Sequence, residues 1–586
     1  LYNVALGDNA LRSNTTASNN TAVGYQAGYS KTTGDPITAV GHQALTSVTT
    51  GAYSTAVGRN AGDSVTTGNH NTLMGNFTGA DITTGANNTA IGSESLRSNT
   101  TASNNTAVGY QAGYSNTTGA DNVALGYQAL NANTTYRRNT AVGKFALKNS
   151  EANENTAVGT SAIGSASNTG TALVGLGYVA LQNNTSGSYN TAIGHSALTA
   201  NTTASENTAV GYQAAYSNTT GINSSFGSSA LKQNTTGTSN TAIGKNSIQL
   251  NTTGNYNTAL GQSALYSNTT ANNNTSVGYR AGYSTTTGES NVFVGGASWN
   301  SGYGAGYNNT TGQYNVAVGA NSLGNNTTAS NNTAVGYQAG YSKTVSDDNT
   351  FIGGGAGYSS TTGSKNTCVG AGSGYNLTTG YKNTILGRYN GNQGGLDIRT
   401  SNNNIVLSDG DGNPRYHINS FGFHKLNGVA EISGNSCVLR LDPNGGNFYG
   451  IILKNISTNT TYAMKFFNSS TTEVGSIVQS NTGVTYNTSS DYRLKENVVD
   501  LTGATERLKQ LEPKRFNFIA DADTTVDGFL AHEVQAVVPE AINGEKDAVD
   551  AEGNPDYQGI DQSKLVPLLV ATIKELEARI TALENA

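Results

Sequence analysis

A repeat of seventeen residues fills the first two thirds of the chain and constrains its fold more than any other feature. The motif Asn-Thr-Ala-Val-Gly-x-x-Ala recurs 23 times, and 18 of the 22 intervals between its glycines equal 17 residues. Periods of this size are typical of solenoids, in which each unit stacks on the next. The 73 glycines and the Asn/Thr runs resemble a disordered segment in composition, but the fixed period predicts order.

One unit has enough residues for one coil of a β-solenoid. In the second copy, Thr21 and Val23 are expected on one side of an extended segment and Ala22 on the other. Gly24 permits a turn that a Cβ atom would hinder, and a second apolar patch at Ala27 precedes a turn of Asn, Thr, Ser and Gly. We predict two short strands and two turns per coil. Stacked at strand spacing, the coils would form a shaft of roughly 110 Å.

Equivalent positions of successive units should form columns along this shaft. The first position of the unit is Asn in 20 of 23 copies, the exceptions being Ile37, Ser54 and Leu173. We predict that these amides bond to one another from coil to coil. The Val position accepts only apolar residues, which predicts a buried column. Cys368 replaces Ala in the adjacent column and is therefore predicted to be a small buried thiol.

The motif resembles the head repeat of trimeric autotransporter adhesins of the YadA type. In that family, Asn-Ser-Val-Ala-Ile-Gly-like units coil into a left-handed roll, and three rolls pack around an axis. The units here are three residues longer, which would enlarge a turn. The resemblance implies a homotrimer. A thin coil with two apolar faces favours the same assembly, because it cannot bury both faces alone.

One interval, from Gly295 to Gly319, is seven residues longer than the others and contains the sole tryptophan, Trp299. An inserted loop on a regular shaft is a candidate receptor contact, for which we name Trp299 and Tyr303 and expect host carbohydrate as the ligand. The alternative is a tolerated surface insertion without a binding role.

The period stops after residue 387, and residues 388–489 form a predicted β-rich neck. Short alternating segments separated by turn signals predict antiparallel hairpins at 404–407, 415–418, 429–432, 438–441, 450–453, 463–467 and 476–479. The sequence Asp409-Gly410-Asp411-Gly412-Asn413 resembles part of a calcium loop but lacks the glutamate that completes one. We interpret it as a hairpin turn and predict no metal site.

The charge of the chain changes abruptly at Ser490. Residues 490–586 contain 10 Lys/Arg and 19 Asp/Glu, a net charge of −9. The totals of 31 and 37 leave 21 basic and 18 acidic residues in the first 489, a net charge of +3. This long part therefore gives no electrostatic reason to expect nucleic acid as a partner. We predict a separate module over residues 490–586.

The first residues of this module form a candidate nucleophilic site. Serine is a weak nucleophile unless a base removes its proton, and lysine is such a base only when burial keeps it neutral. Ser490 and Lys495 are five residues apart, so a turn held by Asp491, Arg493 and Asn497 can bring their side chains together. Such a pair also arises by chance, and the residues that follow decide between the two interpretations.

The pattern Ser-Asp-x-Arg-x-Lys-x-Asn from Ser490 resembles the self-cleaving intramolecular chaperone domain that ends phage tail spikes and fibres, known from endosialidases. Further matches are Leu511-Glu512-Pro513, Phe516, the run from Gly528 to Gln535, Pro539-Glu540 and Leu565 to Leu569. The resemblance covers about 97 residues and departs at His532, where many relatives have Gln. It implies cleavage between Ser489 and Ser490, with Ser490 and Lys495 catalytic and Asp491, Arg493, Asn497, His532 and Glu533 in support.

The chain ends in a predicted coiled-coil helix over residues 563–586, with Ser563 as its N-cap. Apolar residues step by three and four, which is the pattern of a coiled-coil seam: Val566, Leu569, Ile573, Leu576, Ile580 and Leu583. Ile at a with Leu at d favours two strands, whereas the family resemblance implies three.

These features together predict a mainly β protein: a solenoid shaft (1–387) in a homotrimer, a neck (388–489) and a small α/β module (490–586). We expect a phage tail fibre, extracellular on the virion, that attaches to the host and releases its chaperone by autoproteolysis. A bacterial cell-surface adhesin is the alternative, and a glycan-degrading spike is disfavoured because the shaft's acidic residues are sparse and scattered. We expect no cofactor, nucleic acid or membrane span.

Overall fold

The computed structural model describes residues 2–165, 167–297, 302–422, 424–426, 461–467, 473–479, 483–550 and 553–586. It divides the chain into two compact units, residues 1–433 and 434–586. Trp299 and the predicted neck segments 429–432, 438–441 and 450–453 lie outside the described residues.

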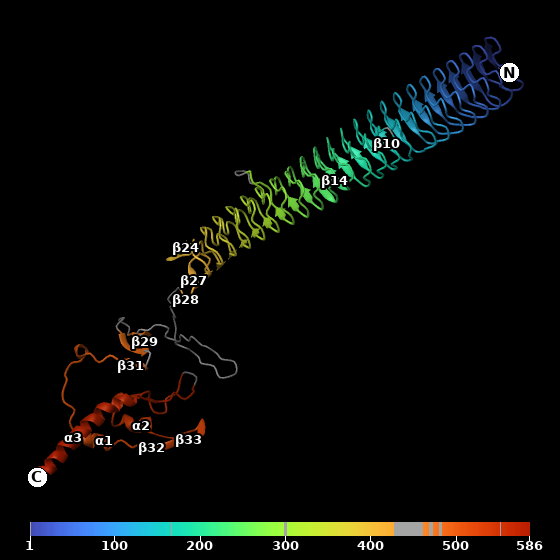
Figure 1. The fold of residues 1–586 in the computed structure, drawn as a ribbon. Helices are drawn as coiled ribbons and strands as arrows, with labels where there is room; N and C mark the ends of the chain where they lie inside the picture. The colour runs from blue at the N-terminus through green and yellow to red at the C-terminus, as the bar shows by residue number, and fades with distance from the viewer. Residues whose placement is uncertain are drawn as a thin grey trace. The chain divides into compact units, whose positions relative to one another are not determined.

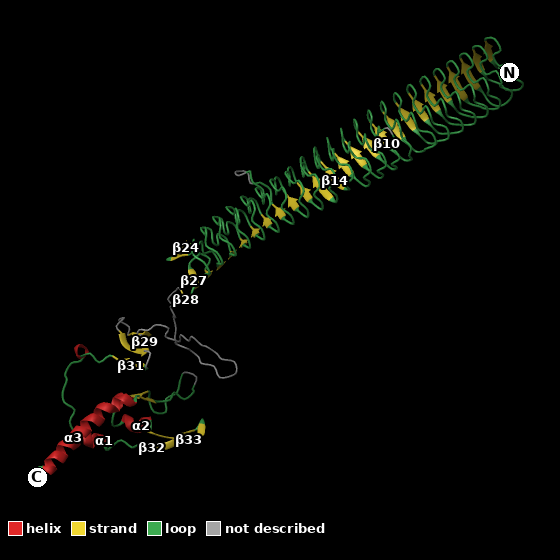
Figure 2. Ribbon diagram, in the orientation of Figure 1, coloured by secondary structure: helices red, strands yellow, loops and turns green. Residues whose placement is uncertain are grey.

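The repeat region forms a β-solenoid of about 23 coils, as predicted, and each coil contributes one strand to a continuous parallel sheet (Figures 1 and 2). The strands are β1 Val4–Leu6, β2 Thr21–Val23, β3 Ile37–Val40, β4 Ser54–Val57, β5 Thr72–Met74, β6 Thr89–Ile91, β7 Thr106–Val108, β8 Val123–Leu125, β9 Thr140–Val142, β10 Thr156–Val158, β11 Val174–Leu176, β12 Thr191–Ile193, β13 Thr208–Val210, β14 Asn223–Phe226, β15 Asn240–Ile243, β16 Thr258–Leu260, β17 Thr275–Val277, β18 Val292–Val294, β19 Val316–Val318, β20 Thr333–Val335, β21 Thr350–Ile352, β22 Thr367–Val369 and β23 Thr384–Leu386. The predicted second strand of each coil is wrong, because the patch at Ala27 lies in a turn.

Equivalent residues of successive coils pair in register along the whole sheet. Thr21 pairs with Thr38 and Val23 with Val40, and the same positions meet in the later coils. The long interval does not disturb this register, since Val294 pairs with Val318 across it. The strands on either side of the insertion therefore stack as they do elsewhere in the shaft.

The backbone conformation and the close approach of the next coil explain why glycine follows each strand. Gly24 has φ +132°, and a Cβ atom added there would lie 2.4 Å from the carbonyl oxygen of Gly41 in the next coil. Other residues are therefore excluded by both conformation and space. The repeat keeps this glycine because adjacent coils pass too closely for a side chain.

The buried and exposed columns of the strand differ from the prediction. The Ala column is the buried one, and Ala22, for example, has no exposed surface. The Val column, which we predicted to be buried, faces outward with the Thr column, and Ile243 and Leu260 are 39% and 45% exposed. Alternation of side chains along a strand allows only one of these columns to face the inside of its own coil. The outer surface of the sheet is therefore an apolar stripe, formed by residue Val23 and its equivalents.

The asparagines at the first position of the unit bond from coil to coil, as predicted. The Oδ1 atom of Asn88 accepts a hydrogen bond from the backbone N–H of Asn105 at 3.0 Å, and its Nδ2 donates to the Ala102 carbonyl at 2.9 Å. A second column, not recognised in the sequence, includes Asn309 and Asn326, whose side chains bond at 2.7 Å. The first column thus pairs backbone groups inside the solenoid, whereas in the second column some amide atoms, such as the Oδ1 of Asn201, have no partner within the described residues.

Lys343 follows Asn326, the last asparagine of the second column, and the next positions are Ser360 and Leu377. Its side chain is fully buried, and Nζ donates to the carbonyl of Gly363. Burial lowers the pKa of this ammonium group from 10.5 to about 7, against a weaker opposing effect of Asp347. The Oδ1 atom of Asn326, which faces this rung, has no hydrogen-bond donor within the described part of the chain.

We expect Lys343→Asn to stabilise the shaft and to remove one source of its pH dependence. Between about pH 7 and pH 10.5 the unfolded chain holds a proton on Lys343 that the folded chain lacks, so wild-type stability rises with pH across this window. The substitution would extend the asparagine column by one rung and gain about 1 kcal/mol or more per copy near neutral pH. Thermal unfolding at several pH values measures this, and equal pH slopes for the two proteins would contradict it.

The stack continues past residue 387 for one more rung. Strand β26 (Ile405–Ser408) pairs parallel to β23, and β27 (Pro414–Ile418) and β28 (His424–Leu426) follow antiparallel. A small hairpin, β24 (Asn392–Gln393) with β25 (Leu396–Asp397), precedes them. The Asp409 segment is a hairpin turn, as interpreted, and its carboxylate accepts hydrogen bonds from the Asn413 amide and from Arg415.

The second unit contains a three-stranded antiparallel sheet and an α/β module. The sheet consists of β29 (Thr461–Phe467), β30 (Glu473–Gln479) and β31 (Val484–Thr488). The module comprises η1 Tyr492–Leu494, α1 Ala504–Leu508, β32 Lys514–Phe518, β33 Asp521–Gly528, α2 Ala531–Gln535, η2 Pro539–Ala541, β34 Ile542–Asn543, β35 Gly559–Ile560, η3 Gln562–Leu565 and α3 Val566–Glu584. None of its helices, and no other in the described residues, is long and apolar enough to cross a membrane.

The C-terminal helix begins with η3, and its cap differs from the prediction. Asp561, rather than Ser563, accepts the capping hydrogen bond, which comes from the backbone N–H of Ser563. Pro567 stands in the first turn of α3, where a helix needs no amide donor. Leu565, Leu568 and Thr572 are buried against the module.

Candidate active site

The site lies where the chain leaves β31. The backbone N–H of Ser489 donates to the carbonyl of Val474 at 3.2 Å, so the chain remains attached to the sheet up to this residue. Ser490 follows and is exposed. The peptide bond between Ser489 and Ser490 is therefore held on one side by a sheet and is accessible to solvent on the other.

A short helical turn brings Ser490 and Lys495 together. Asp491 caps η1 by accepting from the backbone N–H of Arg493 at 2.9 Å, and the N–H of Lys495 closes the turn on the Tyr492 carbonyl at 3.1 Å. The Nζ of Lys495 donates to the Oγ of Ser490 at 2.8 Å. The two side chains that the sequence nominated are thus within hydrogen-bond distance.

An ion pair stiffens this turn. The guanidinium of Arg493 binds the Asp491 carboxylate through both oxygens, at 3.0 and 2.7 Å. This hydrogen bonding lowers the pKa of Asp491, with a smaller contribution from the charge of Lys495. Two oxygens bound by one planar group fix an orientation that a single contact would not. Asn497 has φ +57° and lies at a bend after the turn.

The other two predicted supporting residues lie on α2 and make separate contacts. Glu533 lies 3.7 Å from the Nζ of Lys514, and His532 lines a hollow with Tyr557 and Gln558. Within the described part of the chain, no hydrogen bond or ion pair joins His532 or Glu533 to Ser490 or Lys495. The structure therefore brings together the nominated pair and its turn, but not these two residues.

The apolar side chains that follow Ser490 are exposed to solvent. Tyr492, Val498 and Val499 are 81%, 80% and 87% exposed, and Leu494 is also exposed. Lys495 is exposed as well, so in the single chain its side-chain amine is in contact with water. Burial away from water is what allows a lysine to act as the base for a serine. The geometry of the pair is present, but the dry surroundings that would activate it are not.

Glu575, which the sequence analysis did not identify, connects the last helix, α3, to the start of α1. Glu575 on α3 accepts from the backbone N–H groups of Ala504 and Thr505, both at 2.7 Å, at the start of α1. These hydrogen bonds lower the pKa of Glu575. The only local sign was Gly503, which precedes α1 and has no side chain to cap it.

Of the two predicted receptor residues, the structure describes Tyr303 but not Trp299. Trp299 lies outside the described residues, whereas Tyr303 stacks on Tyr307 with ring centroids 4.6 Å apart. Tyr307 also stacks on Tyr283, which stacks on Tyr266. Tyr303 thus adds to a row of aromatic rings on consecutive coils.

The sequence of residues 490–543 matches the protein family described as chaperone of endosialidase. The match begins at Ser490 and includes Lys495, His532 and Glu533. No curated protein and no solved structure matches the chain. A domain of this family suggests a trimeric, fibre-like protein that carries an intramolecular chaperone.

Proposed function

We propose that this chain is the subunit of a homotrimeric phage tail fibre that attaches to the host surface. Its C-terminal module assembles the trimer and then releases itself by cleavage before Ser490. The observation that carries this proposal is the 2.8 Å hydrogen bond between Lys495 and Ser490, at the first residues of the chaperone-family match.

The cleavage is an acyl transfer within one chain. Neutral Lys495 takes the proton of the Ser490 hydroxyl as Oγ attacks the carbonyl carbon of Ser489. The bond from that carbon to the Ser490 nitrogen breaks, and the nitrogen takes up a proton to become a free amine. Water then hydrolyses the resulting ester, which leaves a carboxylate on Ser489 and restores the Ser490 hydroxyl.

Assembly would supply the missing activation. The exposed apolar residues around the pair, such as Tyr492 and Val499, form a surface that neighbouring copies can cover. Covering it would remove water from Lys495 and favour its neutral form. Cleavage would then follow correct assembly rather than precede it.

The apolar stripe of the shaft supports the same assembly. A partner that covers it must present apolar groups at one strand spacing over some twenty rungs. A second copy of this chain does so without further adjustment, because its own stripe has the same period. We propose that the three stripes face one another around the fibre axis.

A chaperone is useful because a repetitive shaft does not define its own register. Slippage by one coil replaces most contacts with equivalent ones, so it costs little locally. A trimeric module at one end would fix the register before the coils pair. After cleavage, the shaft would persist through its high barrier to unfolding.

The mass of the purified native particle tests this proposal. We expect three chains of 489 residues together with a separate fragment of 97 residues that begins at Ser490. A stable single chain of 586 residues would overturn both the assembly and the cleavage.

We further propose that the loop with Trp299 and Tyr303 contacts host carbohydrate. Removing residues 297–303 joins Gly296 to Gly304 and restores the 17-residue interval. The resulting Gly-Gly-Gly-Ala-Gly-Tyr is identical to residues 353–358 of a regular coil, so the shaft should fold unchanged. We expect host-cell binding to fall at least tenfold. Unchanged binding by a folded trimer would exclude the loop as the contact.

A second candidate function is a bacterial cell-surface adhesin, which the solenoid of Asn-Thr-Ala-Val-Gly coils favours. Both functions would use the same trimer. An antibody against the shaft distinguishes them, because it should label purified virions for a tail fibre and the bacterial envelope for an adhesin.

A further inference from the structure

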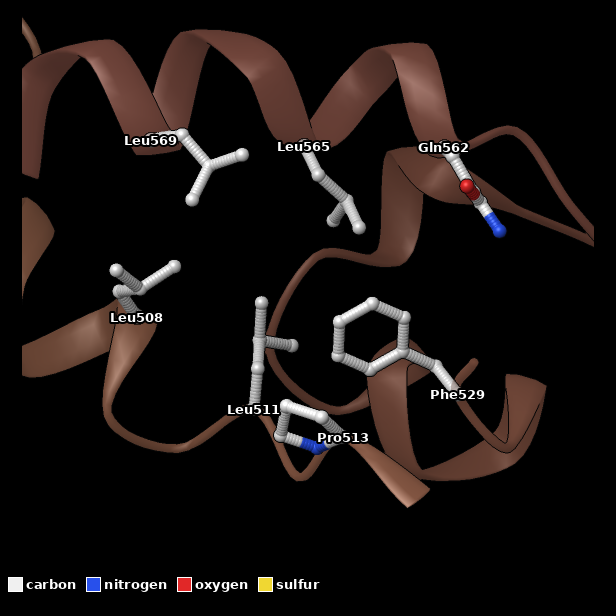
Figure 3. A pocket seen from close by; sticks show the side chains of 7 residues that line it. All are labelled: Leu508, Leu511, Pro513, Phe529, Gln562, Leu565 and Leu569. Carbon is white, nitrogen blue, oxygen red and sulfur yellow. The ribbon is translucent and has the colours of Figure 1, made fainter. Parts of the chain in front are cut away.

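The C-terminal module contains an apolar pocket beside its last helix. The cavity has a volume of about 370 Å³ and is lined by Leu508, Leu511, Pro513, Phe529, Gln562, Leu565 and Leu569. Leu565 and Leu569 project into it from the C-terminal helical segment, opposite Leu508 and Leu511 (Figure 3). All but Gln562 are apolar, so the pocket suits a hydrocarbon side chain.

The pocket lies between two different faces of the helix. One face, with Leu568, Thr572 and Glu575, packs on the module and binds the start of α1. The other face is the predicted coiled-coil seam, and its members are all exposed: Val566, Leu569, Ile573, Leu576, Ile580 and Leu583. Leu569 belongs both to this seam and to the lining of the pocket. A partner that packs on the seam must therefore also meet the pocket.

The charge pattern beside the seam selects a parallel copy of this helix. The seam places Ile at heptad position a and Leu at position d. The g positions are then Leu565, Thr572 and Arg579, and the e positions are Val570, Glu577 and Glu584. In a parallel coiled coil, a g residue lies beside the e residue five positions further along the neighbouring helix. Arg579 then meets Glu584 of the next copy with opposite charge. An antiparallel pair would instead place e beside e, and so bring glutamates together.

The same register points to the occupant of the pocket. We propose that Val570 of a neighbouring copy packs on Leu565 and closes the pocket. Val570 is 47% exposed in the single chain and projects from the side of α3 that the module leaves bare. Each copy would offer its pocket to one neighbour and its Val570 to the other, so the contacts run head to tail and close into a ring. This inference rests on the proposed trimer and adds the residues that build it.

A disulfide tests this contact in the full-length chain. We would combine Leu565→Cys with Val570→Cys in a chain that carries Ser490→Ala to prevent release, and Cys368→Ala and Cys437→Ser to remove other thiols. The two new cysteines cannot pair within one helix, since five residues rise by about 7.5 Å and disulfides need Cα atoms closer than about 7 Å. We expect oxidation to link three chains covalently, whereas either single variant should leave them separate.

The outcomes separate this inference from the proposed function. If native trimers form but do not cross-link, the pocket contact is wrong and the trimeric assembly is unaffected. If the chains remain single, both the pocket contact and the trimeric assembly are wrong. Covalent products that stop at two chains would also overturn the ring.

A charge exchange tests the register without altering the pocket. In the full-length chain that carries Ser490→Ala, Arg579→Glu should slow assembly of the trimer at least fivefold, and adding Glu584→Arg should restore the rate. Both side chains are exposed in the single chain, so its fold should not change. A double variant that assembles as slowly as Arg579→Glu would refute the parallel register.

Discussion

Ser490→Ala and Lys495→Ala should each leave the 586-residue chain whole, whereas the wild type should yield the 97-residue fragment. The first substitution removes the oxygen that attacks the Ser489 carbonyl, and the second removes the amine that bonds to that oxygen. Loss of a nucleophile or its base lowers the rate by more than about 1000-fold in serine hydrolases. Mass spectrometry of the products after assembly measures the effect directly.

Two matched controls make this result specific. Ser489→Ala alters the neighbouring serine and should still be cut, although the new carboxyl end would be alanine. Lys509→Ala removes an exposed lysine that pairs with Glu506 on α1, and it should also be cut. Native mass must show that the uncut variants are trimers, because a misassembled chain would also stay whole. A cut that survives either Ser490→Ala or Lys495→Ala would rule out the pair as nucleophile and base.

The shaft could be predicted from the sequence because its constraints are local and repeated. The glycine after each strand and the asparagine before it reflect contacts between adjacent coils, so every copy carries the same signal. It was harder to predict which face of the strand is buried. A segment such as Thr21-Ala22-Val23 alternates, but the alternation does not say which side is inside. The structure places the small Ala22 inside, where a narrow coil has little room, and leaves the larger Val23 outside.

The active-site pair was predictable for a similar reason, because a five-residue spacing is a local property. Asp491, Arg493 and Lys495 interact within one turn, and the sequence nominated all three. Glu575 was not predictable, since it meets Ala504 from 71 positions away. Only the folded module brings such distant residues together, and helix patterns do not report them.

The largest effect on assembly should come from charging the apolar stripe. We expect the triple substitution Ile243→Lys, Leu260→Lys and Val277→Lys, in three consecutive coils, to prevent formation of the trimeric shaft. Each apolar rung that leaves water contributes on the order of 1 kcal/mol per copy, and the variant would replace this with nine buried ammonium groups in one short section. Within a single chain these side chains point away from the coil interior, so the individual coils keep their cores.

A control on the same three coils isolates the stripe from the general effect of added charge. Ser239→Lys, Tyr256→Lys and Asn273→Lys change the residue before the first-position asparagine, where later coils naturally carry Lys365 and Lys382. Their backbone φ values match those of the two natural lysines, at 55–60°. Native mass and circular dichroism should show a folded trimer for this control and monomers or aggregates for the stripe variant. If the stripe variant assembled as well as the control, the exposed valine column could not be the face through which the three shafts pack.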